Sequence, residues 1–277
     1  MFICDAQIHL WAADRPDRPW PADGHARRHR PEPLGVDEAL REMDRAGVDR
    51  AVLVPPSFEG DYNDLSLAAA KAHPDRFAVM GRVALEDPAT PEKMARWRDQ
   101  PGMLGVRLTF INDRHRGLLA SGAVEPFWAA AEAAGVPVMV LPPDQISTIE
   151  AVARRHPKLK LVIDHLAMAS QWKDDEAFRR VPEVLTLAAC LNVAVKASAL
   201  PCYTSEAYPY PSIQGLLGQV FDAFGPDRMF WGSDLSRLPC PYTYCITHFT
   251  ETLPFLDTTA KERVMGKAIC EWLGWPV

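Results

Sequence analysis

The sequence alternates short apolar runs with longer amphipathic segments from one end to the other. This alternation is typical of parallel βα units, because two neighbouring parallel strands need a crossover segment, usually a helix, between them. We expect strands at residues 1–8, 50–54, 77–83, 104–110, 136–141, 159–164, 193–197 and 228–232. Eight such units are the number that closes a (β/α)₈ barrel.

The segments between these runs carry apolar residues at helical spacing. We expect helices at residues 36–46, 65–72, 91–98, 124–134, 146–155, 178–189, 213–224, 242–252 and 260–273. A doubly wound open sheet would alternate in the same way, but neither of the glycine-rich phosphate-binding motifs of such folds occurs. No stretch reads as a linker. The prediction is therefore an α/β protein, a single TIM-barrel domain spanning residues 1–277.

Composition narrows the function classes. The formal net charge is −6 and the isoelectric point is near 5.8, which argues against a nucleic-acid partner. The absence of a long apolar run or a leader pattern predicts a cytoplasmic protein with no membrane partner. The six cysteines form no CxxC pair, so we expect reduced, structural thiols. Homo-oligomer formation stays open, with Trp272 and Trp275 as either contact or core residues.

Polar side chains follow the expected strands at the points where the apolar runs stop. In a barrel these carboxyl ends converge on one face, where active sites lie. The polar residues at these ends are Gln7, His9, Arg107, Asp164, His165, Lys196, Ser198, Ser233, Asp234 and Arg237. Each alone has an ordinary structural explanation, such as Asp234 capping a turn. Their joint position at successive strand ends predicts a pocket.

Two long loops would flank this pocket. Residues 15–33 follow the first strand and carry the cluster Arg27, Arg28, His29 and Arg30. This loop is either a solvated charged segment or a lid that presents cations to an acidic substrate. Residues 199–211 carry Tyr203, Tyr208 and Tyr210 and could form the opposing wall. Loops of this length in compact domains are often functional.

The order of the motifs resembles one known family. Asp5-Ala6-Gln7-Ile8-His9-Leu10-Trp11 is similar to the Asp-Ala-His-x-His-x-Trp opening of amidohydrolases related to 2-pyrone-4,6-dicarboxylate lactonase and sugar-acid lactonases. Further similar segments are residues 105–107 (Gly-Val-Arg), 162–166 (Val-Ile-Asp-His-Leu), 195–198 (Val-Lys-Ala-Ser), 230–234 (Phe-Trp-Gly-Ser-Asp) and 266–268 (Gly-Lys-Ala). The resemblance spans essentially the whole chain, and it implies a barrel hydrolase.

Two positions depart from the metal-binding members of that family. Those members have His-x-His on the first strand and a histidine ending the fifth, where this chain has Gln7 and Leu141. His9, His165 and Asp234 could still hold one divalent metal, zinc or manganese, because a catalytic zinc site needs about three protein ligands. The pyrone-dicarboxylate lactonases that the pattern resembles work without metal. We therefore expect no cofactor.

These residues suggest a metal-independent lactonase acting on a small anionic substrate, a carboxylated lactone. In this hypothesis Asp234 is the general base, while His165 and His9 polarise the carbonyl. Arg107 would bind a substrate carboxylate in a bidentate manner. The other expected substrate-binding residues are Gln7, Lys196, Ser198, Tyr203 and Arg237.

Two alternatives remain open at this stage. One is a metal-dependent decarboxylase or hydratase of an unsaturated dicarboxylic acid on a related barrel. The other is a catalytically degenerate binding protein, which the Gln7 and Leu141 positions suggest. The retention of His9, His165 and Asp234 argues against the second alternative, because an unused site need not keep three polar groups.

Overall fold

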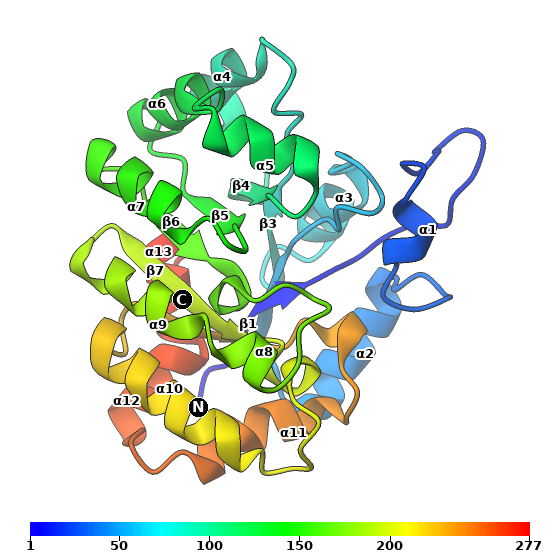
Figure 1. Ribbon diagram of the computed structural model, residues 1–277. Coiled ribbons are helices and arrows are strands. Elements are labelled where there is room, and N and C mark those ends of the chain that lie inside the picture. The colour runs from blue at the N-terminus through cyan, green and yellow to red at the C-terminus, as the bar shows by residue number, and fades with distance from the viewer.

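Eight strands pair in sequence order, each parallel to the next, in the computed structural model, which describes residues 1–277 (Figure 1). The strands are β1 Cys4–Ile8, β2 Arg50–Leu53, β3 Phe77–Gly81, β4 Met103–Thr109, β5 Val138–Leu141, β6 Leu161–Ile163, β7 Val193–Ser198 and β8 Met229–Gly232. Every expected strand is present, with its ends shifted by a few residues at most. The prediction of a (β/α)₈ barrel is confirmed.

The barrel closes where β8 meets β1. The Asp234 backbone N–H donates to the Gln7 carbonyl at 3.0 Å. The buried Asp5 carboxylate accepts from the Ser233 backbone N–H at 2.9 Å and from the Tyr242 hydroxyl at 2.5 Å. A Cβ at Gly232 would lie 3.3 Å from the backbone nitrogens of β1, so a glycine suits this tight seam. The first and last strands are thus locked together directly below the strand ends.

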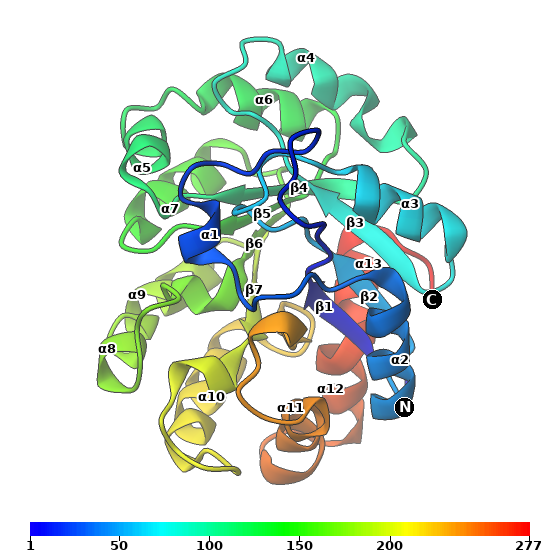
Figure 2. The ribbon, with the colours of Figure 1, turned by 90° about the vertical axis from the view of Figure 1, so that its right-hand side faces the viewer.

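Helices surround the strands, and the segment that contains α1 lies across the face where the strands end (Figure 2). The α-helices are α1 Gly24–Arg27, α2 Val36–Ala46, α3 Asp64–Ala72, α4 Thr90–Lys93, α5 Asp113–Ala120, α6 Glu125–Ala133, α7 Ile146–Arg155, α8 Asp175–Phe178, α9 Val181–Leu185, α10 Pro211–Phe224, α11 Tyr242–Thr247, α12 Thr258–Glu262 and α13 Ala268–Leu273. None of them combines the length and the hydropathy that a membrane crossing requires.

The helices differ from the expectation in three ways. Segments expected as single helices are broken into shorter α, 3₁₀ and π pieces, as in residues 90–99, 175–189 and 242–273. Helix α1 interrupts the segment that we expected to be a loop. Helix α5 was not predicted because its sequence is mostly polar. Its N-cap explains it, since the Asn112 side chain accepts from the His115 backbone N–H at 2.8 Å.

The inside of the barrel is layered. One apolar cluster takes residues from all eight strands and from α13, including Ala194 of β7. The flanking Val193 and Val195 belong to the larger cluster, which includes most of the buried helix residues. Alternation along a strand therefore points Ala194 inward, and Lys196 lies two residues further along the same face. All six cysteines are free, as expected, and five of them are buried.

Candidate active site

A cavity of about 380 Å³ lies at the face where the strands end. It is lined by five of the nine residues expected to form the site: His9, Arg107, His165, Asp234 and Arg237. Leu141, at the end of β5, also lines it and offers no ligand atom. The barrel therefore brings together residues that are far apart in the sequence, as the strand-end argument predicted.

Unusual backbone conformations aim two of these side chains. His165 follows β6 with φ of 52°, and Asp234 follows β8 with φ of 56°. Residues other than glycine rarely adopt positive φ, and such strain collects at functional sites. Neighbouring strands hold the turn at Asp234, since the Asp234 N–H donates to β1 and the Ala199 N–H donates to the Gly232 carbonyl at 3.2 Å, whereas the turn at His165 is closed by the Met168 N–H, which donates to the His165 carbonyl at 3.0 Å. The contacts between β8 and β1 thus fix where the Asp234 carboxylate points.

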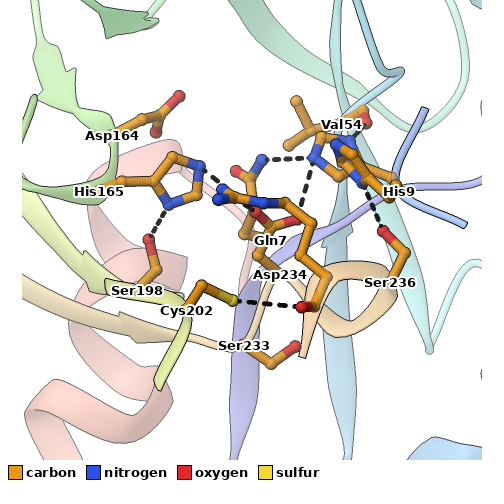
Figure 3. Close-up of polar contacts among 12 residues, drawn as sticks. Gln7, His9, Val54, Asp164, His165, Ser198, Cys202, Ser233, Asp234 and Ser236 are labelled. Atoms are coloured by element: carbon orange, nitrogen blue, oxygen red, sulfur yellow. Dashed lines mark hydrogen bonds and ion pairs between the residues drawn. The ribbon is translucent and has the colours of Figure 1, made fainter. Parts of the chain in front are cut away.

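Asp234 is the centre of the polar contacts (Figure 3). Its Oδ1 lies 3.1 Å from His9 Nε2, and its Oδ2 lies 3.1 Å from Arg237 Nη1 and 3.7 Å from His165 Nε2. Burial would raise the pKa of this carboxyl, but the adjacent His9, Arg237 and His165 hold it well below its ordinary value. Asp234 is therefore an ionised acceptor at neutral pH, although only 1% of the residue is exposed.

The two other histidines on the wall are neutral at physiological pH. Burial lowers the pKa of His165 to about 3, and it lowers the pKa of His29 well below its ordinary value. His165 Nδ1 is 2.8 Å from Ser198 Oγ, and His29 Nδ1 is 2.8 Å from Ser236 Oγ. The hydroxyl partners orient both rings. These two rings therefore add no positive charge to the cavity.

A charged layer lies directly beneath the cavity. Lys196 is fully buried, and its Nζ lies 2.9 Å from Asp164 Oδ1 and 2.7 Å from Gln7 Oε1. The other oxygen of Asp164 accepts from Arg107 Nε. Burial lowers the pKa of Lys196, and Asp164 opposes that shift. Lys196 and Gln7 do not line the cavity, so the structure places them as supports of the site rather than on its wall.

This layer fixes the hydrogen on the His9 ring. The Lys196 ammonium can only donate, so it must face Gln7 Oε1, which turns the Gln7 amide nitrogen toward His9 Nε2 at 3.1 Å. The Val54 carbonyl can only accept, and it lies 2.5 Å from His9 Nδ1. His9 therefore carries its hydrogen on Nδ1, and its Nε2 accepts from the Gln7 amide.

The remaining expected residues lie behind the wall. Ser198 is buried and holds His165, as described above. Tyr203 is also buried, and its hydroxyl donates to the Met168 carbonyl at 3.2 Å and lies 3.4 Å from Arg237 Nη1. Neither residue lines the cavity, and neither do Tyr208 or Tyr210, so the segment 199–211 does not form the opposing wall.

The loop after β1 forms part of the cavity wall. The sequence had left open whether this loop is solvated or covers the pocket. Arg27, Arg28 and His29 all line the cavity, together with Ser57 and Phe58 from the loop after β2. In a polar, proline-rich loop, nothing in the sequence except their charge indicated that these residues would line the cavity. Arg30 lies outside this group because Glu38 holds it in two hydrogen bonds of 2.8 Å.

The residues present fit a divalent metal poorly. Ligand atoms of His9, His29 and Asp234 lie within 4.8 Å of one another, so His29 replaces His165 in the set expected from the sequence. The Gln7 amide nitrogen, however, already faces His9 Nε2 at 3.1 Å. The Arg237 guanidinium, also 3.1 Å from Asp234, adds a positive charge that would repel a cation. Leu141 contributes no donor.

Eight parallel strands with an acid–base cluster at their carboxyl ends define a (β/α)₈-barrel hydrolase. The chain belongs to the amidohydrolase family, whose model matches residues 4–275. It is 31% identical over 245 residues to an L-fucono-1,5-lactonase of Burkholderia ambifaria, a match that covers 86% of this chain and 82% of the relative. The expected enzyme class, a hydrolase of the lactonase type, is confirmed.

Solved structures share the fold. An amidohydrolase of Burkholderia multivorans with bound HEPES superposes with a TM-score of 0.82 at 22% identity, over 100% of both chains. The zinc-bound form of that amidohydrolase gives 0.79 at 21% identity, again over 100% of both chains. A probable 2-pyrone-4,6-dicarboxylic acid hydrolase of Acinetobacter baumannii with citric acid bound gives 0.75 at 20% identity, over 99% of this chain and 100% of the other.

Proposed function

We propose that this enzyme hydrolyses a carboxylated lactone without a metal ion. The observation that carries the proposal is the charge of the cavity wall. Four arginines line it, namely Arg27, Arg28, Arg107 and Arg237, and Asp234 is the single carboxylate among the lining residues. A cavity with this balance, in a chain whose net charge is −6, favours an anionic substrate.

Arg107 is the group best placed to bind the substrate carboxylate. Its Nε is engaged by Asp164, whereas its two terminal nitrogens have no hydrogen-bond partner in the protein. A guanidinium held at Nε in this way presents its remaining N–H groups in a fixed plane, which suits a carboxylate. Arg28 also lines the cavity, makes no ion pair and is exposed at its rim.

Asp234 is the general base in this proposal. It is ionised, and it accepts a proton from the water that attacks the lactone carbonyl. The Gln7 amide, turned by Lys196, donates to His9 Nε2 and so fixes the His9 ring beside Asp234. The Arg237 guanidinium and the neutral His165 ring stabilise the oxyanion that forms. The proton then passes from Asp234 to the ring oxygen that leaves.

The substrate class is tested with matched lactones. The enzyme should hydrolyse six-membered lactones that carry a ring carboxylate with kcat/KM at least about tenfold higher than their methyl esters, because a charge-assisted hydrogen bond contributes roughly 1.5–3 kcal/mol. L-fucono-1,5-lactone serves as the comparison suggested by the curated relative. A preference for the sugar lactone or for the esters would refute the anionic substrate class.

Metal independence predicts a second result. Protein purified without added metal should contain far less than one equivalent of zinc or manganese, as measured by mass spectrometry of the elements. Its kcat should be unchanged after dialysis against a chelator and after addition of either ion. A stoichiometric metal whose removal abolishes turnover would instead support the metal-dependent alternative, with His9, His29 and Asp234 as the ligands.

A further inference from the structure

A second cavity of about 250 Å³ adjoins the one that contains Asp234. It lies between the start of α5, the loop after β5 and the segment that follows β6. Three residues, Arg27, Ile111 and Ser170, line both cavities. The two cavities therefore lie next to each other, with these three residues between them.

The shared wall is apolar at Ile111. This side chain is one of the few large hydrophobic residues that are exposed, with 36% of its surface accessible. Leu141 lies on the side of the first cavity, and Ala169 and Pro143 lie on the side of the second. A hydrocarbon segment laid across Ile111 would remove this apolar surface from water, which is favourable.

Arg116 on the wall of the second cavity is a loosely paired cation. Asp144 Oδ1 pairs with Arg180 Nη1 at 2.6 Å, whereas Asp144 Oδ2 is 3.7 Å from Arg116 Nη2, beyond hydrogen-bond distance. Arg180, which is also 3.8 Å from Glu183 Oε1, thus takes the closer contact, and Asp144 holds Arg116 only loosely. Arg116 is held at its backbone, where its carbonyl accepts from Gln145 Nε2 at 3.0 Å, while its side chain is 37% exposed. Its guanidinium is thus available to an anion.

We infer that the second cavity is a subsite for an anionic arm of the substrate. The inference rests on the proposed lactonase function and names its substrate class more closely: besides the ring carboxylate that Arg107 binds, the lactone has a second carboxylate at the end of an aliphatic chain. The lactone ring occupies the first cavity beside Asp234. The chain crosses Ile111, and its terminal carboxylate binds Arg116.

The test uses two lactones with the same ring, one bearing a carboxyalkyl arm and one bearing an alkyl arm of equal length. It also uses the corresponding cyclic ethers, which cannot be hydrolysed, as ligands in calorimetry. The variant is Arg116→Gln. The matched control is Arg114→Gln, on the same helix, whose side chain pairs with Glu86 at 2.5 Å and lines neither cavity. Thermal unfolding checks that both variants are folded.

Arg116→Gln should weaken binding of the carboxylated ether, and raise KM for the carboxylated lactone, by about tenfold or more. For the alkyl compounds, the affinity of the ether and the KM of the lactone should change by no more than about twofold. Arg114→Gln should leave both quantities unchanged for all four compounds. Equal binding of the two ethers to the unaltered enzyme, or an equal effect of Arg116→Gln on both, would overturn the subsite. If the carboxylated ether binds through Arg116 but no lactone is hydrolysed, the subsite stands and the lactonase function fails.

Discussion

Asp234→Asn should lower kcat for the preferred lactone by about 10³-fold, within the range that a positioned general base contributes. Asparagine keeps the shape of the side chain, and its carbonyl can still accept from Arg237, which lies 3.1 Å from Asp234 Oδ2. It cannot take a proton from water. KM, and the affinity for an unreactive analogue, should therefore change by only a few-fold. Steady-state kinetics and calorimetry measure the two effects separately.

The matched control for this variant is Asp222→Asn, on the exposed side of α10 and remote from the cavity. It should behave as the unaltered enzyme does. If Asp234→Asn retained more than about a tenth of the original kcat, the base would have to be another group. His9, which also lines the cavity, would be the next candidate.

Lys196→Met should lower the free energy of unfolding by about 3–5 kcal/mol, the usual cost of breaking a buried ion pair from one side. Methionine fills a similar volume but leaves Asp164 with Arg107 as its only cationic partner and removes the donor to Gln7. Denaturant unfolding measures the change. Because Gln7 would then be free to turn, kcat should fall further than the loss of folded protein explains.

Lys71→Met is the control for that measurement, because Lys71 is exposed on α3 and makes no ion pair. A surface change of this kind usually shifts stability by no more than about 0.5 kcal/mol. If Lys196→Met cost less than about 1 kcal/mol, Arg107 alone would be compensating the Asp164 charge. The role of Lys196 as a support of the site would then be wrong.

The positions of the eight strands could be predicted because parallel strands buried on both faces are short apolar runs. Helix α5 could not, since it depends on the Asn112 cap and has few apolar residues. The breaks in the two helices expected at 242–252 and 260–273 could not be predicted either. An apolar pattern at helical spacing continues through π turns and kinks.

The sequence predicted which residues gather at the strand ends, but not which of them reach the cavity wall. Position at a strand end indicated which residues converge, and five of them do line the cavity. Position at a strand end did not indicate whether a side chain lines the cavity or lies below it. Lys196 and Ser198 both point inward from β7, yet they lie in successive layers below the cavity wall, as the alternation from Ala194 requires. Arg27, Arg28 and His29 entered from a loop whose course depends on tertiary contacts.

That loop is fastened at both ends. On one side Glu59 accepts from the Ala12 N–H and from Arg18 Nε, each at 2.9 Å. On the other side Arg30 is clamped by Glu38 at 2.8 Å. The stretch between these anchors lines the cavity through Arg27, Arg28 and His29 but carries none of the barrel strands. Residues 21–29 can therefore be varied without changing the barrel. Laboratory evolution confined to this stretch should change substrate selectivity while Asp234 and the other residues at the strand ends keep their positions.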